Sequence, residues 1–199
     1  MATIHRTTMK PTKLELLTEW LPRQKWFEGN TAAPELANAG GFRLDDPEGL
    51  VGIEFMVVTD ASGGAPVAYL VPLSYRGAAL DGAPDEALIG TSEHGVLGTR
   101  WIYDGAHDPT LMGELAALLR GDAAPQQQNE SDAPDPSVTV QGHDREGAQV
   151  GDRGGNEIRL HRVLRPAEAA HEPPVHLTAG WSWPDGTPAR GVFASIGSR

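Results

Sequence analysis

Two histidines beside a carboxylate are the residues that most resemble a hydrolytic metal site in this sequence: His171, Glu172 and His176. The helix of a zinc protease places two histidines four residues apart, so that both face one metal ion and the glutamate after the first acts as a base. Here the spacing is one residue longer, and Pro173 and Pro174 between the histidines prevent such a helix. We interpret the segment as a loop and expect no metal site.

A glycine cluster at positions 147, 151, 154 and 155 could form a turn around a phosphate. No Gly-Lys-Ser or Gly-Lys-Thr follows it, and a glycine cluster alone is typical of a hairpin loop. Phosphoryl transfer also needs a lysine on the nucleotide phosphates, a catalytic aspartate and carboxylates for magnesium. We find no segment before Arg199 that would supply a catalytic loop, so we expect no catalytic residue, no cofactor and no enzymatic activity.

Five tryptophans could stack on sugars or on a partner protein. Three of them lie in apolar helix or strand segments and are predicted to be buried: Trp20, Trp26 and Trp101. Trp181 and Trp183 alternate along one predicted strand face beside a turn, which favours an exposed interaction surface. We add the strand residues His161 and Arg162 to this candidate interaction surface.

The composition excludes several other classes of function. The 199 residues include no cysteine, which excludes disulfides, thiolate nucleophiles and cysteine-based zinc sites. A net charge of −11 repels phosphate backbones, so we expect no nucleic-acid partner. No apolar run approaches the ~20 residues of a membrane span, and residues 1–10 lack the apolar core of a signal peptide. We therefore expect a soluble cytoplasmic protein with no membrane partner.

Two helices are clearly predicted by their capping residues. Thr12 and Glu15 have the spacing of a capping box at the start of the first helix, and Pro22 ends it. Asp108 is a suitable N-cap for the second helix, which continues to Gly121. Leucines recur on one face of each helix, as expected for helices that pack on a sheet.

The remaining pattern predicts short antiparallel strands. Strands are expected at 42–44, 51–59, 66–73 and 96–103, and again in the tail at 138–141, 157–164, 175–181 and 191–196. The fold class is therefore α+β, with a helix packed on a curved antiparallel sheet, followed by a second small antiparallel sheet. We divide the chain into a compact unit at 1–121, an acidic disordered linker at 122–136 and a β-rich subdomain at 137–199.

Three segments, in the same order along the chain, resemble the N-terminal cap of bacterial maltokinases. The first runs from Leu17 to Phe27, the second is Tyr69-Leu-Val-Pro-Leu73, and the third runs from Trp101 to Pro109. The residues that carry the resemblance, which we expect to be structural, are Trp20, Leu21, Gln24, Trp26, Phe27, Pro72, Tyr103, Asp104, His107, Asp108 and Pro109.

The resemblance implies a cystatin-like cap, which maltokinases carry in front of an aminoglycoside-phosphotransferase-like kinase. It also implies that the tail is similar to part of a kinase N-lobe, with Arg159 at the position of the nucleotide-binding lysine. Arginine has a larger, planar head group and is a poor replacement for that lysine. The chain is thus expected to be a stand-alone relative of the cap without the kinase C-lobe.

Three functions remain open from the sequence. The first is a non-catalytic accessory or regulatory protein in maltose, trehalose or α-glucan (glycogen) metabolism, whose partner is an enzyme of that metabolism or a second copy of the chain. The second is a carbohydrate-binding module that uses Trp181 and Trp183. The third is a residual ATP-dependent maltokinase-like phosphotransferase.

Overall fold

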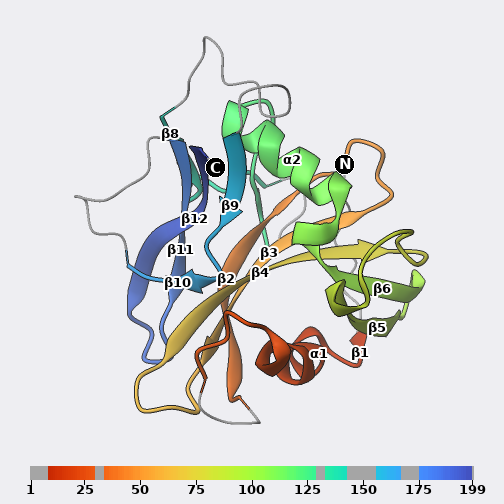
Figure 1. Ribbon diagram of the computed structural model, residues 1–199, viewed down its shortest axis with the longest axis horizontal. Helices are drawn as coiled ribbons and strands as arrows, with labels where there is room; N and C mark the ends of the chain where they lie inside the picture. The colour runs from red at the N-terminus through yellow and green to blue at the C-terminus, as the bar shows by residue number, and fades with distance from the viewer. Residues whose placement is uncertain (1–8, 30–33, 129–132, 143–155, 167–174, 199) are drawn as a thin grey trace.

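Two antiparallel sheets and two α-helices form the part of the chain that the computed structural model describes (Figure 1). The described residues are 9–29, 34–128, 133–142, 156–166 and 175–198. The predicted α+β class, with a curved sheet and a second small sheet, is confirmed. Most of the segment 171–176, which is predicted to be a loop, and all of the glycine cluster at 147–155 lie outside the described residues.

The larger sheet, sheet A, has the strand order β1-β5-β6-β4-β3-β2-β7, and β10 pairs with part of β4. Its strands are β1 (Met9–Lys10), β2 (Leu36–Leu44), β3 (Gly52–Asp60), β4 (Val67–Arg76), β5 (Leu88–His94), β6 (Gly98–Asp104), β7 (Gln126–Gln127) and β10 (Val163–Leu164). β5 was not expected, because Gly90 interrupts its apolar pattern and produces a bulge opposite β6.

The smaller sheet, sheet B, has the strand order β8-β11-β12-β9. Its strands are β8 (Thr139–Gln141), β9 (Asn156–Leu160), β11 (Val175–Ser182) and β12 (Pro188–Ser198). Each of them overlaps a predicted strand of the tail. The predicted strand at 157–164 divides, because its last two residues leave sheet B and join sheet A as β10.

Both helices begin and end where their caps predict. In α1 (Lys13–Trp20), Thr12 and Glu15 form the capping box. In α2 (Pro109–Arg120), Asp108 accepts a hydrogen bond from the Thr110 amide, and Gly121 takes the left-handed conformation with φ 84°. Single 3-10 turns are η1 (Leu21–Arg23), η2 (Asp85–Ala87) and η3 (Gly105–His107).

The two faces of sheet A are covered by different parts of the chain. Alternate residues of β3 point to opposite faces, so that Phe55 and Val57 belong to one core while Met56 and Val58 belong to the other. In the view of Figure 1, α1 lies on the lower side of β3 and β4, whereas α2 and sheet B lie on the upper side. We call the two cores the α1-side core and the α2-side core.

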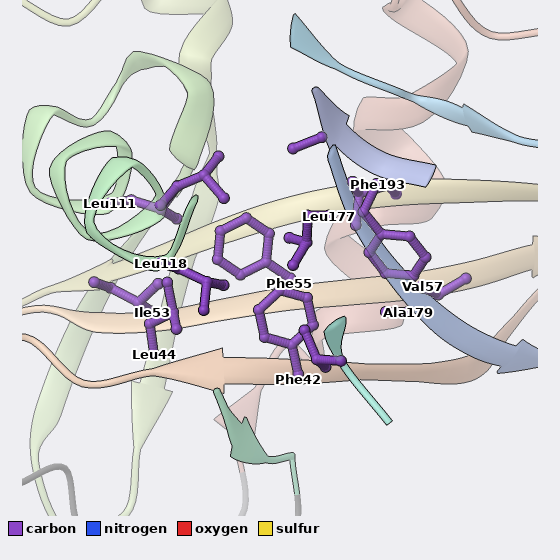
Figure 2. Close-up of a cluster of buried hydrophobic side chains, with 14 of the residues drawn as sticks. Phe42, Leu44, Ile53, Phe55, Val57, Leu111, Leu118, Leu177, Ala179 and Phe193 are labelled. Carbon is purple, nitrogen blue, oxygen red and sulfur yellow. The ribbon is translucent and has the colours of Figure 1, made fainter. Parts of the chain in front are cut away.

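The α2-side core joins sheet A, sheet B and α2 (Figure 2). Phe42 and Phe55 stack with their ring centroids 4.6 Å apart, and Phe193 of β12 lies against Phe42 at 6.2 Å. Leucines of α2 and of β11 pack around these rings. The tail therefore packs on the cap-like half of the chain through a shared apolar core.

Residues 126–127 lie within the segment predicted to be a disordered linker, and there the structure differs from the prediction. They form β7, which pairs with Phe42 and Arg43 of β2, and Gln126 also forms an isolated bridge with Pro134. The segment is polar, as the sequence indicates, but a strand at a sheet edge is held by backbone hydrogen bonds and needs little apolar burial.

Candidate functional site

Arg162 connects the tail to the residues of the maltokinase-like signature. Its Nη2 donates to both carboxylate oxygens of Asp104, at 2.7 Å each, and its guanidinium lies 5.2 Å from the ring centroid of Trp26. The Asp104 side chain is 5% exposed and that of Arg162 is 13% exposed. Removing one partner of such a shielded contact costs more than breaking a surface ion pair, because the other charge is left buried without a counter-ion. Arg162 was expected on an open interaction surface, and it is instead held inside the molecule.

Trp26 and Phe27 form an aromatic cluster around Tyr69. Trp26 lies 5.9 Å from Trp20 and 5.9 Å from Tyr69, and Phe27 stacks on Tyr69 at 5.5 Å. The Tyr69 hydroxyl accepts a hydrogen bond from the Glu28 amide, and burial, the largest effect, raises the pKa of Tyr69. The cluster fixes the chain after α1 against β4, which gives these signature residues a structural role.

A second buried carboxylate, Asp108, combines two structural tasks. It caps α2 and also binds Arg76 through two 2.7 Å hydrogen bonds, while Arg76 reaches Thr110 as well. Burial would raise the pKa of Asp108, but the hydrogen bonds that the carboxylate accepts, above all from Arg76, and the Arg76 charge outweigh burial and lower that pKa. The aspartate is therefore held ionised as a structural anchor.

Glu54 is the centre of a third polar cluster, which the sequence analysis missed. Its side chain is 7% exposed and accepts hydrogen bonds from Lys13 at 2.8 and 3.0 Å, from Tyr75 at 2.5 Å and from Gln128 at 2.6 Å. Burial opposes ionisation, yet the Lys13 charge and these hydrogen bonds lower the pKa of Glu54. The signal in the sequence was a lone acid inside the apolar run 51–59.

The other signature residues are also engaged within the fold. Trp20 donates its indole N–H to the Glu86 carbonyl at 3.0 Å, and the Gln24 side chain donates to the Trp20 carbonyl at 3.2 Å. The Tyr103 hydroxyl accepts from the Leu80 amide. Leu21 and Pro72 are buried, whereas His107 and Pro109 are exposed at the start of α2.

Trp181 and Trp183 do not form an exposed pair. Trp181 is only 4% exposed and packs into the α2-side core, where its ring lies over Gly191 and 6.3 Å from Phe193. Trp183 is half-buried and meets Trp181 edge to face at 5.8 Å. The expectation of exposure was wrong for Trp181. The face of β11 that carries Trp181 is turned toward sheet A, and the ring packs between the two sheets.

His161 and Arg159 have different contacts from Arg162. His161 exchanges a 2.9 Å hydrogen bond with the Ser195 hydroxyl, and burial, followed by the charges of Arg159 and His176, lowers the pKa of His161. Arg159 is exposed on β9 opposite Ser195. The four residues of the candidate interaction surface are thus divided among the core, the Ser195 contact and the Asp104 contact.

The described residues contain no group of three or more His, Asp or Glu side chains that could hold a metal ion. In the same part of the chain, no helix is long and apolar enough to cross a membrane.

Residues 20–108 match the family model described as the maltokinase N-terminal cap domain. The match covers the second signature segment, most of the first and third, sheet A from β2 to β6 and the N-cap of α2. This part of the chain is therefore similar to the maltokinase N-terminal cap domain, as the resemblance implied. No curated protein matches the chain.

Proposed function

We propose that this protein is a non-catalytic accessory or regulatory protein that binds an enzyme of maltose, trehalose or α-glucan metabolism. One observation carries the proposal. The cap-domain residues with chemically capable side chains, Trp26, Asp104 and Asp108, are each engaged with partners inside the fold. A buried carboxylate held by arginine stabilises architecture and is not positioned to move a proton to a substrate.

The link to this branch of metabolism rests on the cap-domain family, which is described by its place in maltokinases. A separate cap protein of this kind would act by binding the enzyme and would not catalyse a reaction itself. The carbohydrate-binding alternative depended on exposed tryptophan rings that could stack on a sugar. The Trp181 ring faces the core and is not available for such stacking.

Affinity capture followed by enzyme assay tests the proposal. Tagged protein is crosslinked in native lysate, and the captured material is assayed for enzymes that act on maltose, trehalose or α-glucan. We expect one such enzyme to be enriched over a control with unrelated acidic protein. Thorough crosslinking that enriches none of these activities would contradict the proposal.

A phosphotransfer assay tests the catalytic alternative directly. The purified protein is incubated with radiolabelled ATP, magnesium and maltose or trehalose. We expect no sugar phosphate above the level of a heat-denatured sample. Turnover that survives repeated purification would replace the accessory role with a kinase activity.

A further inference from the structure

An extended basic stretch of the tail, residues 162–165 (Arg-Val-Leu-Arg), lies along the edge of β4; we call it the basic segment. Val163 pairs with Tyr69 and Leu164 with Ala68, and the Leu70 amide donates to the Arg162 carbonyl at 2.9 Å. The pairing occupies a gap in the sheet, because β6 pairs with β4 only from Leu73 onward. The edge of β4 is thus able to accept an added strand.

The side chains of the basic segment are received by complementary groups of the cap domain. Arg162 meets Asp104 and the face of Trp26, and Arg165 meets Glu28 at 2.7 Å. Between them, Val163 packs against the α1-side core and Leu164, at 1% exposed, belongs to the α2-side core. The cap domain therefore recognises two arginines separated by two apolar residues.

The cap domain does not satisfy the basic segment fully. The Nη1 atom of Arg162 is buried and has no hydrogen-bond partner among the described residues. The Arg165–Glu28 pair is 66% and 47% exposed, where water and salt screen it. Only two residues pair with β4 as a regular strand. The segment also belongs to the same chain, which gives it an effective concentration on the order of millimolar, and a partner segment must compete with it.

We propose that the edge of β4, with Trp26, Asp104 and Glu28, is a docking site for an extended Arg-x-x-Arg segment of a partner protein, and that the basic segment occupies it in the partner's absence. The partner adds a strand to β4 and places its first arginine between Asp104 and Trp26. This inference identifies the contact surface for the proposed binding role and rests on that role. The net charge of −11 favours a basic ligand.

Peptide binding to purified full-length protein tests the docking site. The probe is a fluorescent peptide with the sequence of residues 158–166, Ile-Arg-Leu-His-Arg-Val-Leu-Arg-Pro. Fluorescence anisotropy compares the wild type with a double variant, Arg162→Ala and Arg165→Ala, which weakens the internal occupant. We expect the double variant to bind the peptide at least tenfold more tightly than the wild type does.

Two controls connect binding to the named contacts. Adding Asp104→Asn to the double variant should weaken peptide binding about tenfold, and a peptide with both corresponding arginines replaced by glutamine should bind no better to the variant than to the wild type. Hydrogen exchange gives the location. The Leu70 amide should exchange faster in the double variant and be protected again by the arginine peptide.

The outcomes are separable. A folded double variant that shows no saturable binding up to 1 mM peptide, or that binds the glutamine peptide equally well, overturns the inference. Self-association of the variant in sedimentation, in place of peptide binding, also overturns it by making a second copy the occupant.

If the double variant does not fold, Arg165→Ala alone removes only an exposed contact and should still tighten peptide binding two- to threefold. No change in peptide affinity would overturn the inference. Peptide binding without recovery of a metabolic enzyme would reject the proposed function alone.

Discussion

The two faces of sheet A are covered in different ways. On the α1 side, the core is closed mainly by the helix and turn that directly precede the sheet, with Leu17, Trp20 and Leu21 packed on β3 and β4. On the α2 side, the core is closed by α2 and by sheet B, whose residues lie up to about 150 positions further along the chain than Phe42. The α1-side core is thus built mainly from residues near one another in the sequence, and the α2-side core from residues far apart in the sequence.

The family match ends at residue 108, so α2 and sheet B lie outside it. The apolar face formed by Phe42, Phe55 and Leu70 would be open to water if these later elements were absent. The part of the chain that resembles the cap domain therefore depends on the elements after residue 108 to close its α2-side core. Stability measurements can test that dependence from both sides.

The largest expected effect is that of Phe193→Ala in β12. Phe193 is fully buried between the sheets, so its loss leaves a cavity and should lower the free energy of unfolding by about 3–5 kcal/mol. Urea unfolding followed by tryptophan fluorescence and by circular dichroism should shift as one transition. Trp183→Ala, at a half-buried site, is the control and should have a smaller effect. If most of the fluorescence and circular-dichroism change in the Phe193→Ala variant occurred at the same urea concentration as in the wild type, the tail would be an independent folding unit.

Asp104→Asn should come next, because it breaks the charged contact between the tail and the cap domain. The change leaves the shielded guanidinium of Arg162 without its anion, for which we expect a loss of about 3 kcal/mol. Chemical unfolding measures it, and Arg120→Ala, which removes an exposed ion pair with Asp122, is the matched control with an effect below about 1 kcal/mol. Equal effects for the two would show that the Asp104 contact is not shielded in solution.

Glu54→Gln should change the pH dependence of stability on the α1 side. The pKa of Glu54 is lowered in the folded protein, so its ionised form stabilises the fold above the unfolded value of about 4.3. That contribution is lost as the pH falls through the folded pKa. The variant should be less stable at pH 7 by about 1–3 kcal/mol and should lose less stability than the wild type between pH 5 and pH 3. Parallel curves for the two proteins would exclude this role.

The smallest expected effect is that of Thr12→Ala, which removes the capping box of α1. The side chain of Thr12 satisfies the Glu15 amide, and its loss should lower the free energy of unfolding by about 1 kcal/mol. Thr12→Ser, which keeps the hydroxyl, should restore most of it. Thermal unfolding is sensitive enough for this comparison. An effect as large as that of Phe193→Ala would mean that the α1 side is the weaker of the two.

Much of the local structure could be predicted from the sequence because its signals are local. Thr12, Asp108 and Gly121 mark helix ends through their own backbone and side-chain chemistry. The strands of sheet B follow from short apolar runs between turns. The interaction surface could not be predicted in the same way. Trp181 alternates with polar residues as an exposed aromatic would, and only the position of sheet B against sheet A buries it.

The sequence by itself determined the helices, most of the strands and the cap-domain signature, since capping, alternation and turn chemistry act between near neighbours. Tertiary structure alone decided which charges meet. Arg162 finds Asp104 across 58 positions, and Glu54 gathers donors from α1, β4 and the residue after β7. Pairing over such distances depends on how the sheets pack, because a buried charge takes whichever partner the fold places within hydrogen-bond reach.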